Sequence, residues 1–283
     1  MSEDPTAGQT DGQQSGQTLD EVVGRDWDPA QYGQFDRERS QPFYDLTALV
    51  ERRPAMRVLD LGCGTGQLTA WLHRELEASA TLGIDRSASM LEQAAAHAGD
   101  GVRFERATIE ETIALQPPGA FGLVFSNAAL QWVWNHVELV PALAQLVGAG
   151  GQLAIQMPAN GDHASHRIAR ELGRDARFAG PLDGFEREDT VWAPEWYAEQ
   201  LHELGFEVQH VRMQVYGHIL RSTRSVSGWV QGSLLTPYRE RLEPQVYAAF
   251  LSEYEERLMA TLGERSPYFY SFKRLLIWAR RGG

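Results

Sequence analysis

The stretch that decides the fold is residues 58–66, which read Val-Leu-Asp-Leu-Gly-Cys-Gly-Thr-Gly. Its first half, preceded by Arg57, is a short apolar run of the kind that forms a buried parallel strand. Three glycines then mark a tight turn, and residues Gln67 to Leu76 follow with helical spacing. A strand, a glycine-rich turn and a helix in this order predict the opening unit of an α/β fold.

Strand and helix patterns keep alternating beyond this unit. Ser87 is placed to cap a helix through Ala96, and a further helix is expected to end at Val147. The ranges 162–204 and 225–262 read as mainly helical. Further strands are expected at Thr81–Asp85, Val102–Phe104, Phe121–Ser126, Gln152–Met157, Phe206–Leu220 and Phe272–Ala279. This alternation predicts βαβ units and a mostly parallel sheet flanked by helices.

The composition excludes several classes of function. The chain has 283 residues, of which 43% are hydrophobic, and a formal net charge of -12, which argues against a basic track for nucleic acid. Its one cysteine, Cys63, excludes an internal disulfide and a zinc site built on several thiolates. There is no apolar run long enough to span a membrane and no signal-peptide pattern, so we expect a cytoplasmic protein.

The first 24 residues differ from the rest of the chain. They are rich in Gly, Gln, Ser, Thr and Asp and poor in apolar side chains. Such a segment buries too little surface to offset its ordering entropy, so residues 1–24 are expected to form a disordered tail. Residues 25–283 are expected to form a single domain.

The glycine turn and two acids suggest a ligand site. Glycines at 62, 64 and 66 allow a tight turn and a close approach to a ligand. Their spacing differs from the dinucleotide fingerprint G-x-G-x-x-G, which disfavours a nicotinamide dehydrogenase, and it lacks the Lys-Ser/Thr pair of a phosphate loop. Asp60 precedes the turn and can attract a cation. Asp85 ends the next strand, where a carboxylate can accept two ribose hydroxyls.

This run resembles motif I of the class I S-adenosylmethionine-dependent methyltransferases. The resemblance implies a Rossmann-like, mostly parallel seven-stranded sheet whose last strand is antiparallel, with helical insertions at about 25–50, 160–204 and 222–264 forming a substrate cap. It implies that the glycines line S-adenosylmethionine, that Asp85 binds the ribose and that Asp60 supports the methionine amino group. The residues it implies for cofactor binding are Tyr32, Arg39, Asp60, Gly62, Cys63, Gly64, Gly66, Asp85, Arg86, Met90, Ala107, Thr108, Ile109 and Asn127.

Longer segments are similar to the trans-aconitate methyltransferase family. They are Trp27 to Ser40, Asn127 to Trp132, Gln156 to Asn160 and Phe272 to Arg281. The family esterifies one carboxylate of a small tricarboxylic acid, so the resemblance implies a carboxyl O-methyltransferase with an organic-acid substrate. A carboxylate, with a pKa near 4, is already ionised and needs no strong base. The residues expected to bind the substrate are Tyr32, Gln131, Trp132, Met157, Tyr216, His218 and Arg274, with Arg39 as a further cation for the acid.

Departures from that family leave the acceptor open. Thr108 stands where the family has an acid facing adenine, and Leu235-Thr236-Pro237 lacks an arginine. A larger or less charged acceptor would fit these changes. A hydroxyl, amine or carbon acceptor would usually need a base, for which His136, His163 or His218 are the candidates.

One other class of function stays open beside these, and one is disfavoured. A non-catalytic protein that binds S-adenosylmethionine is one, since a fold does not fix a function. A metal-dependent enzyme is disfavoured, because the nearest group of possible ligands, Asp162, His163 and His166, reads better as a polar loop. No metal, nucleic acid or membrane partner is expected, and the sequence does not specify an oligomeric state.

Overall fold

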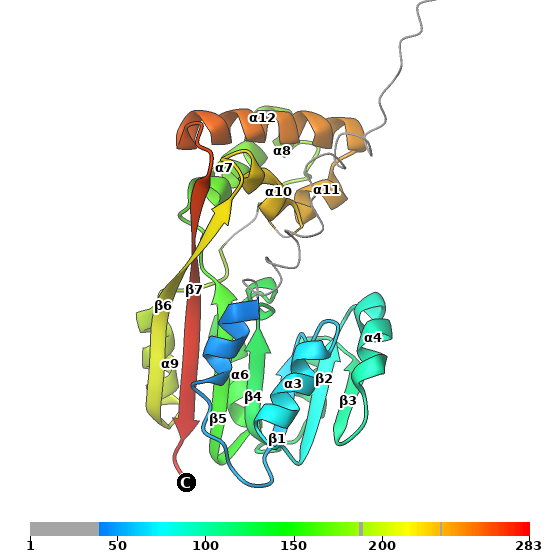
Figure 1. Ribbon diagram of the computed structural model, residues 1–283, viewed down its shortest axis with the longest axis vertical. Helices are drawn as coiled ribbons and strands as arrows, with labels where there is room; N and C mark the ends of the chain where they lie inside the picture. The colour runs from blue at the N-terminus through cyan, green and yellow to red at the C-terminus, as the bar shows by residue number, and fades with distance from the viewer. Residues whose placement is uncertain (1–39, 187–188, 233) are drawn as a thin grey trace, which may run out of the picture. The chain divides into compact units, whose positions relative to one another are not determined.

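The centre of the molecule is a seven-stranded sheet with the order β3-β2-β1-β4-β5-β7-β6 (Figure 1). The structure is a computed structural model that describes residues 40–186, 189–232 and 234–283. The first five strands pair in parallel, and β7 pairs antiparallel with both β5 and β6. The strands are β1 Arg57–Leu61, β2 Ala80–Asp85, β3 Val102–Arg106, β4 Phe121–Asn127, β5 Val147–Pro158, β6 Phe206–Leu220 and β7 Tyr268–Arg281. The predicted α/β class and the antiparallel last strand are confirmed.

Helices cover both faces of this sheet and extend beyond it. A helical segment at 40–47 precedes the first strand. The others are α3 Gln67–Glu75, α4 Ala88–Ala94, α5 Ile109–Leu115, α6 His136–Leu146, α7 Ala164–Gly173, α8 Ala176–Ala179, α9 Pro194–Glu203, α10 Ser225–Gln231, α11 Thr236–Arg241 and α12 Pro244–Leu262, with short 3-10 turns η1 Ala95–His97 and η2 Leu130–Trp132. Ser87 caps α4 as predicted, because its side chain accepts a hydrogen bond from the Met90 N–H.

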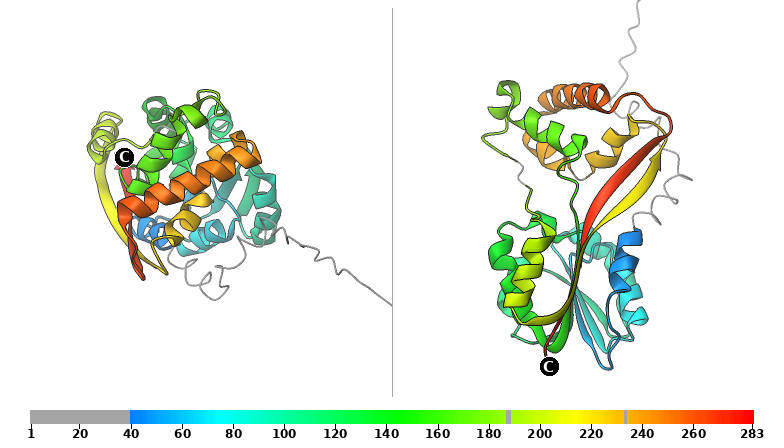
Figure 2. Two further views of the ribbon diagram at one scale, coloured as in Figure 1. Left: turned by 90° about the horizontal axis from the view of Figure 1, so that it is seen from above. Right: turned by 90° about the vertical axis from the view of Figure 1, so that its left-hand side faces the viewer.

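The two faces of the sheet bury different sets of side chains. On the face that we call the α3 face, alternate residues such as Val58, Phe125 and Trp278 pack against the 40–47 segment and α3. On the opposite, α6 face, residues such as Val124 and Ile277 pack against α6 and α9. Figure 2 shows the sheet between these two groups of helices. Strand alternation therefore decides which side chains can meet on either face.

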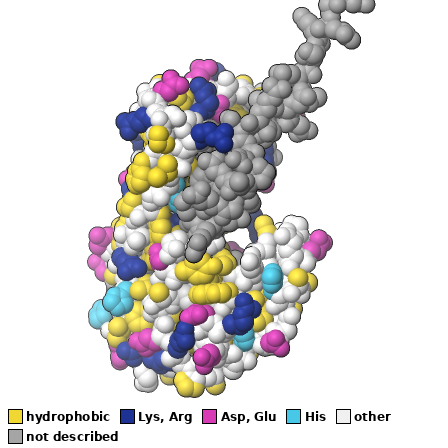
Figure 3. Space-filling view, in the orientation of Figure 1, with side chains coloured by type: hydrophobic (Ala, Val, Ile, Leu, Met, Phe, Trp, Pro, Cys, Tyr) yellow, Lys and Arg dark blue, Asp and Glu magenta, His cyan; other side chains and the backbone are white. Residues whose placement is uncertain are grey.

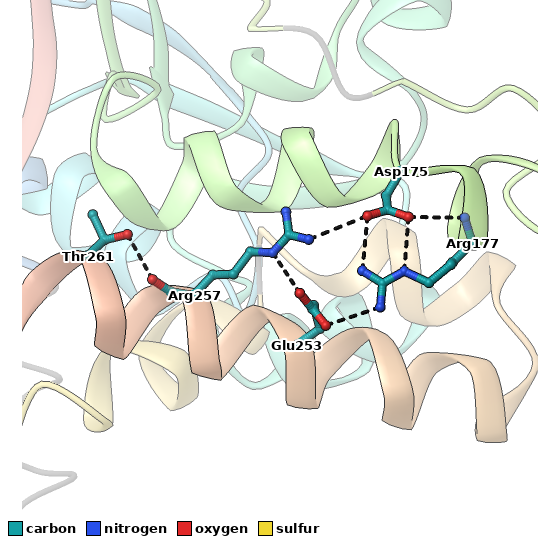
Figure 4. A network of polar contacts seen from close by, with 5 residues as sticks. All are labelled: Asp175, Arg177, Glu253, Arg257 and Thr261. Carbon is teal, nitrogen blue, oxygen red and sulfur yellow. Dashed lines mark hydrogen bonds and ion pairs between the residues drawn. The ribbon is translucent and has the colours of Figure 1, made fainter.

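Beyond the edge of β5, β6 and β7 continue as a two-stranded ribbon towards a layer formed by α7, α8, α10, α11 and α12 (Figures 1 and 2). Residues 41–283 form one compact unit. Within the layer, Asp175, Arg177, Glu253 and Arg257 form a network of ion pairs between α8 and α12, with N–O distances of 2.8 to 3.4 Å (Figure 4). Solvent screens exposed pairs of this kind, so the network adds little to the stability of the fold.

Some apolar side chains remain exposed on the ribbon. Val215, Ile219 and Phe269 are 56 to 67% exposed, and hydrophobic side chains gather beside the ribbon in the space-filling view (Figure 3). Among the residues described, no helix is both long and apolar enough to cross a bilayer.

Parts of the predicted element map were wrong. The cap assignment for 160–204 fails at α9, whose Tyr197 and Leu201 lie in the core on the α6 face. The assignment for 25–50 fails at Phe43 and Leu46, which pack on the α3 face. An amphipathic helix has the same spacing of apolar residues in a cap as on a sheet. The sequence pattern could therefore not distinguish the two locations.

Strand and helix boundaries also differ from the prediction. The fifth strand begins at Val147 instead of Gln152, because its glycines allow an irregular extension of the β4 pairing. The α5 helix was not predicted, although the Thr-x-x-Glu spacing of Thr108 and Glu111 is a capping box. Residues 1–39, including the predicted tail and the first cap segment, lie outside the described residues.

Candidate functional site

The glycine turn lies at the carboxyl end of β1. Gly62, Gly64 and Gly66 all have positive φ, at 78°, 55° and 75°. A Cβ on Gly62 would lie 2.3 Å from the Ala129 Cβ, and one on Gly66 would lie 2.6 Å from the Phe104 ring, so both glycines serve close packing. A Cβ on Gly64 would meet nothing within 4 Å. The middle glycine is therefore the one that opens the backbone to a ligand.

Asp85 anchors this turn to the end of β2. One carboxylate oxygen accepts a hydrogen bond from the Gly64 N–H at 3.0 Å, and the other accepts one from the Ser87 N–H at 2.8 Å. An ionised carboxylate offers about four acceptor sites, so about two remain for hydroxyl groups of a ligand. The same side chain can thus shape the turn and bind a diol.

Asp60 is a buried acid directly below the turn. It is 3% exposed and accepts a hydrogen bond from the Thr69 hydroxyl at 2.5 Å. Burial raises the pKa of Asp60 to about 6, the charge of Asp85 adds to this rise, and the Thr69 hydrogen bond opposes it. Burial disfavours the ionised form of Asp60, so a cation placed beside the carboxylate would be attracted to it and would favour ionisation.

Other residues predicted for the cofactor surround this turn. Burial and the two nearby acids raise the pKa of the Cys63 thiol, which disfavours the reactive thiolate form. Arg86 and Met90 are exposed beside Asp85. Asn127 ends β4, directly across the strand register from Gln156 of β5. Tyr32 and Arg39 lie outside the described residues.

The segment after β3 is arranged by helix capping. The Thr108 hydroxyl accepts a hydrogen bond from the Glu111 N–H, and the Glu111 carboxylate accepts one from the Thr108 N–H. The Ala107 N–H donates to the Asp85 carbonyl at 3.2 Å, which brings 107–109 to the same edge as the glycine turn. Thr108 keeps a hydroxyl proton to donate, whereas Ile109 contributes its buried side chain to the core.

A second group of polar residues lies on the α3 face of β5, β6 and β7. Arg274 is 8% exposed, its guanidinium carbon lies 5.1 Å from the centre of the Phe272 ring, and one Nη donates to the Gln156 Oε1 at 3.4 Å. The Tyr216 hydroxyl donates to Asp45 at 2.7 Å, linking β6 to the 40–47 segment. Burial and Asp45 raise the pKa of Tyr216, while the charge of Arg274 lowers it. The fold therefore places a buried cation beside this tyrosine.

Two of these residues, Gln156 and Asp45, were missed by the sequence reasoning. The segment containing Gln156 was noted for its resemblance, but no pattern marks a single glutamine in a strand as functional. Asp45 sits in a helical segment where an acid is ordinary. Each is recognisable only from its neighbours in space.

The remaining predicted substrate residues do not all reach this group. Met157 is fully buried in the core on the α6 face, opposite to Arg274, because it alternates with Gln156 along the strand. Met157 is therefore not part of the polar group around Arg274. The Gln131 amide donates to the Ala128 carbonyl, and Trp132 is 42% exposed in η2.

His218 lies further along the ribbon, away from the carboxyl edge. It follows Gln214, the residue opposite Arg274, by four positions, or about 13 Å at the rise of a strand. It is 2% exposed, and its ring centre lies 4.5 Å from that of Trp229. His218 thus belongs to the aromatic packing between the ribbon and the helical layer.

The other candidate bases have structural partners. His136 contacts the Tyr197 hydroxyl at 2.5 Å and the Leu130 carbonyl at 3.0 Å, and burial lowers its pKa. His163 caps α7 by accepting a hydrogen bond from the Ser165 N–H. Within the described ranges, no group of three or more His, Cys, Asp or Glu side chains could hold a metal ion.

Known proteins resemble this chain in sequence and fold. Residues 58–151 match a family model described as a methyltransferase domain. A trans-aconitate 2-methyltransferase from Deinococcus radiodurans is 40% identical over 262 residues, covering 90% of this chain and 98% of that protein. One from Delftia acidovorans is 36% identical over 265 residues, with coverage of 90% and 98%. A putative methyltransferase from Bacillus halodurans has a TM-score of 0.58 at 16% identity, covering 85% and 98%.

Proposed function

The chain belongs to the trans-aconitate 2-methyltransferase family, and from this premise we propose that it methylates one carboxylate of trans-aconitate or a similar small organic acid. It is an S-adenosylmethionine-dependent methyltransferase. The observation that supports the acid acceptor is the buried cation Arg274, which lies at the same edge of the sheet as the glycine turn.

The residues around the turn fit S-adenosylmethionine. Gly64 leaves open space where backbone and ligand can meet, and Asp85 has acceptor sites left for the ribose hydroxyls. Asp60 would attract the methionine amino group, whose positive charge favours the ionised form of this buried acid. Ala107, Thr108 and Ile109 would line the adenine, with Arg86 and Met90 at its exposed rim. Tyr32 and Arg39 remain candidates on the strength of the sequence.

The reaction needs alignment more than it needs a base. S-adenosylmethionine, when bound, would supply an electrophilic methyl group for transfer to an acceptor oxygen, with sulfur keeping the electron pair of the broken C–S bond. No proton moves, since the carboxylate is already ionised near neutral pH. The protein's task is to orient the acceptor and exclude water. The packing roles of His136 and His163 agree with a reaction that has no general base.

Arg274 is the residue that we propose holds the acid. A guanidinium binds carboxylates with paired hydrogen bonds, and these are stronger where water is excluded. Tyr216 and its partner Asp45 lie beside it and would limit the size of the acceptor. The exposed Trp132 and the neighbouring Gln131 would stand at the mouth of this pocket.

The test is an assay with purified full-length protein, S-adenosylmethionine and a panel of acids that includes trans-aconitate. We expect a monomethyl ester, identified by mass, and no product from the corresponding amides. A protein that binds S-adenosylmethionine but methylates no carboxylic acid would contradict the proposal. A product on a hydroxyl or amine acceptor would move the function to that class.

A further inference from the structure

Gln156 presents an unusual buried amide. It is 0% exposed on the α3 face of β5, two residues before the end of the strand. Its Oε1 accepts a hydrogen bond from Arg274, so the carbonyl oxygen of the amide faces the guanidinium group. Its Nε2 has no hydrogen-bond partner within the described part of the chain. Buried amide N–H groups are normally paired, so this one calls for an acceptor.

A second unpaired group lies on the neighbouring strand. Asn127 is directly opposite Gln156 in the β4–β5 register, and its Oδ1 also lacks a partner among residues 40–186, 189–232 and 234–283. A donor and an acceptor on adjacent strands, both unpaired, could satisfy each other, yet no hydrogen bond joins them. The arrangement is that of two groups that each face a ligand.

The order of the strands indicates which of the two residues lies nearer the cofactor and which lies nearer the acceptor. From β1 outward the row reads Asp60 and the glycine turn, then Asn127 on β4, Gln156 on β5 and Arg274 on β7. Neighbouring strands lie about 4.8 Å apart. Asn127 adjoins the glycine turn and so the cofactor side, whereas Gln156 adjoins Arg274 and so the acceptor side. Gln156 stands at the boundary where methyl donor and acceptor must meet.

We propose that Gln156 is a specificity-determining residue that donates a hydrogen bond from Nε2 to the acceptor carboxylate. The inference rests on the proposed function and adds a second contact to it. Arg274 supplies the charge, and Gln156 supplies a neutral donor whose direction Arg274 sets through Oε1. An acid at this position would pair with Arg274 and cancel the anion site, so an uncharged amide suits both neighbours.

The contact selects for a carboxylate. Each carboxylate oxygen has two lone pairs, so one can accept from Gln156 while another attacks the methyl carbon. A neutral amide or alcohol in the same place would form a weaker hydrogen bond, because it carries no negative charge.

The experiment compares Gln156→Glu, which keeps an acceptor for Arg274 but removes the donor and adds a negative charge, with Gln156→Met, which removes donor and acceptor without adding a charge. Gln209→Glu is the matched control, because Gln209 is another strand glutamine with a buried Oε1, and its Nε2 donates to the Ala198 carbonyl away from the row. Calorimetry measures S-adenosylhomocysteine binding, then trans-aconitate binding to that complex. Circular dichroism and the unfolding midpoint check that each variant folds.

For both Gln156 variants we expect the Kd of trans-aconitate to rise at least about tenfold, and that of S-adenosylhomocysteine to change less than about threefold. The loss in kcat/KM should fall mainly on KM, and Gln209→Glu should change neither Kd. An unchanged trans-aconitate Kd in folded Gln156→Glu would overturn the inference, as would a loss confined to S-adenosylhomocysteine, which would assign Gln156 to the cofactor. If the wild type itself binds and methylates no acid, the proposed function has failed instead.

Discussion

Arg274 lies opposite Pro158, the last residue of β5, at the final register position that β7 shares with β5. Among the residues that the structure describes, the amino-terminal part of β7 pairs only with β6 and becomes part of the ribbon that leads to the helical layer. The buried cation therefore stands where the ribbon leaves the sheet. It lies between the carboxyl edge of the sheet and the part of the ribbon that leads to the helical layer.

Replacing this cation should separate acceptor binding from cofactor binding. In Arg274→Gln we expect KM for trans-aconitate to rise about 100-fold, as loss of a charge-assisted hydrogen bond predicts, with little change in S-adenosylmethionine affinity. Arg280→Gln is the control on the same strand, because Arg280 pairs with Glu51 at 3.4 Å. Steady-state kinetics and calorimetry measure the two effects. Equal KM values for the two variants would refute the role of Arg274.

The glycine turn offers a matched pair of variants. Gly62→Ala should lower the free energy of unfolding by more than about 2 kcal/mol, since left-handed strain adds to the contact with Ala129. Gly64→Ala adds only the strain of about 1 kcal/mol, yet its methyl group would enter the open space and weaken S-adenosylmethionine binding. Urea unfolding and calorimetry distinguish the two. If Gly64→Ala bound the cofactor normally, the cofactor would not contact the turn there.

Asp85 is expected to be the most sensitive cofactor residue. Asp85→Ala removes acceptors for the ribose and also releases the Gly64 and Ser87 N–H groups, so we expect the Kd of S-adenosylmethionine to rise more than about 30-fold. Glu92→Ala, an exposed acid on α4, is the control for lost negative charge. Binding is measured by calorimetry at one ionic strength. A similar Kd for both variants would mean that Asp85 only shapes the turn.

The raised pKa of Asp60 predicts opposite effects on stability and binding. Its folded pKa of about 6 lies above the ordinary value of 3.8. Between these two pH values Asp60 keeps its proton in the folded chain but loses it in the unfolded chain, so the free energy of unfolding falls as the pH rises from 3.8 to about 6. Asp60→Asn should therefore stabilise the free protein at pH 8, by about 3 kcal/mol. A bound cation favours ionised Asp60, so in the wild type the S-adenosylmethionine Kd should rise roughly tenfold as pH falls from about 7 to about 5.

Urea unfolding at pH 8 and calorimetry across the pH range test these two effects. In Asp60→Asn the Kd should be higher at pH 8 and nearly independent of pH. A wild-type affinity that does not change between these pH values would show that the cofactor does not depend on the charge of Asp60.

The cofactor half of the site could be predicted because its parts are local in the sequence. The turn at 62–66 and Asp85 follow two consecutive strands, and parallel strands bring their carboxyl ends to one edge. Spacing and residue type were therefore enough to place them. The role of Thr108 was not predicted, because this residue caps α5, a helix that the sequence analysis did not identify.

The acceptor half was predicted only in part, because the family resemblance indicated Tyr216 and Arg274 but not Asp45 or Gln156. Asp45, Gln156, Tyr216 and Arg274 come from four distant segments, and only the insertion of β7 between β5 and β6 unites the strand residues. Met157 illustrates the difficulty, since it is adjacent to Gln156 in sequence yet faces the opposite side of the sheet. A family resemblance can indicate the segment, but the alternation of side chains along a strand decides which residue lies on the same face as Arg274.

The place of β7 also sets an order for folding. Residues 57–158 contain five strands that pair with one another, each crossover being local. In the described chain, β6 pairs only with β7, so β6 cannot join the sheet until the last strand has bridged to β5. Such long-range pairing forms slowly compared with local units. A newly made chain should therefore assemble its methyl-donor half first, and a chain cut before Tyr268 should lose two strands of the sheet instead of one.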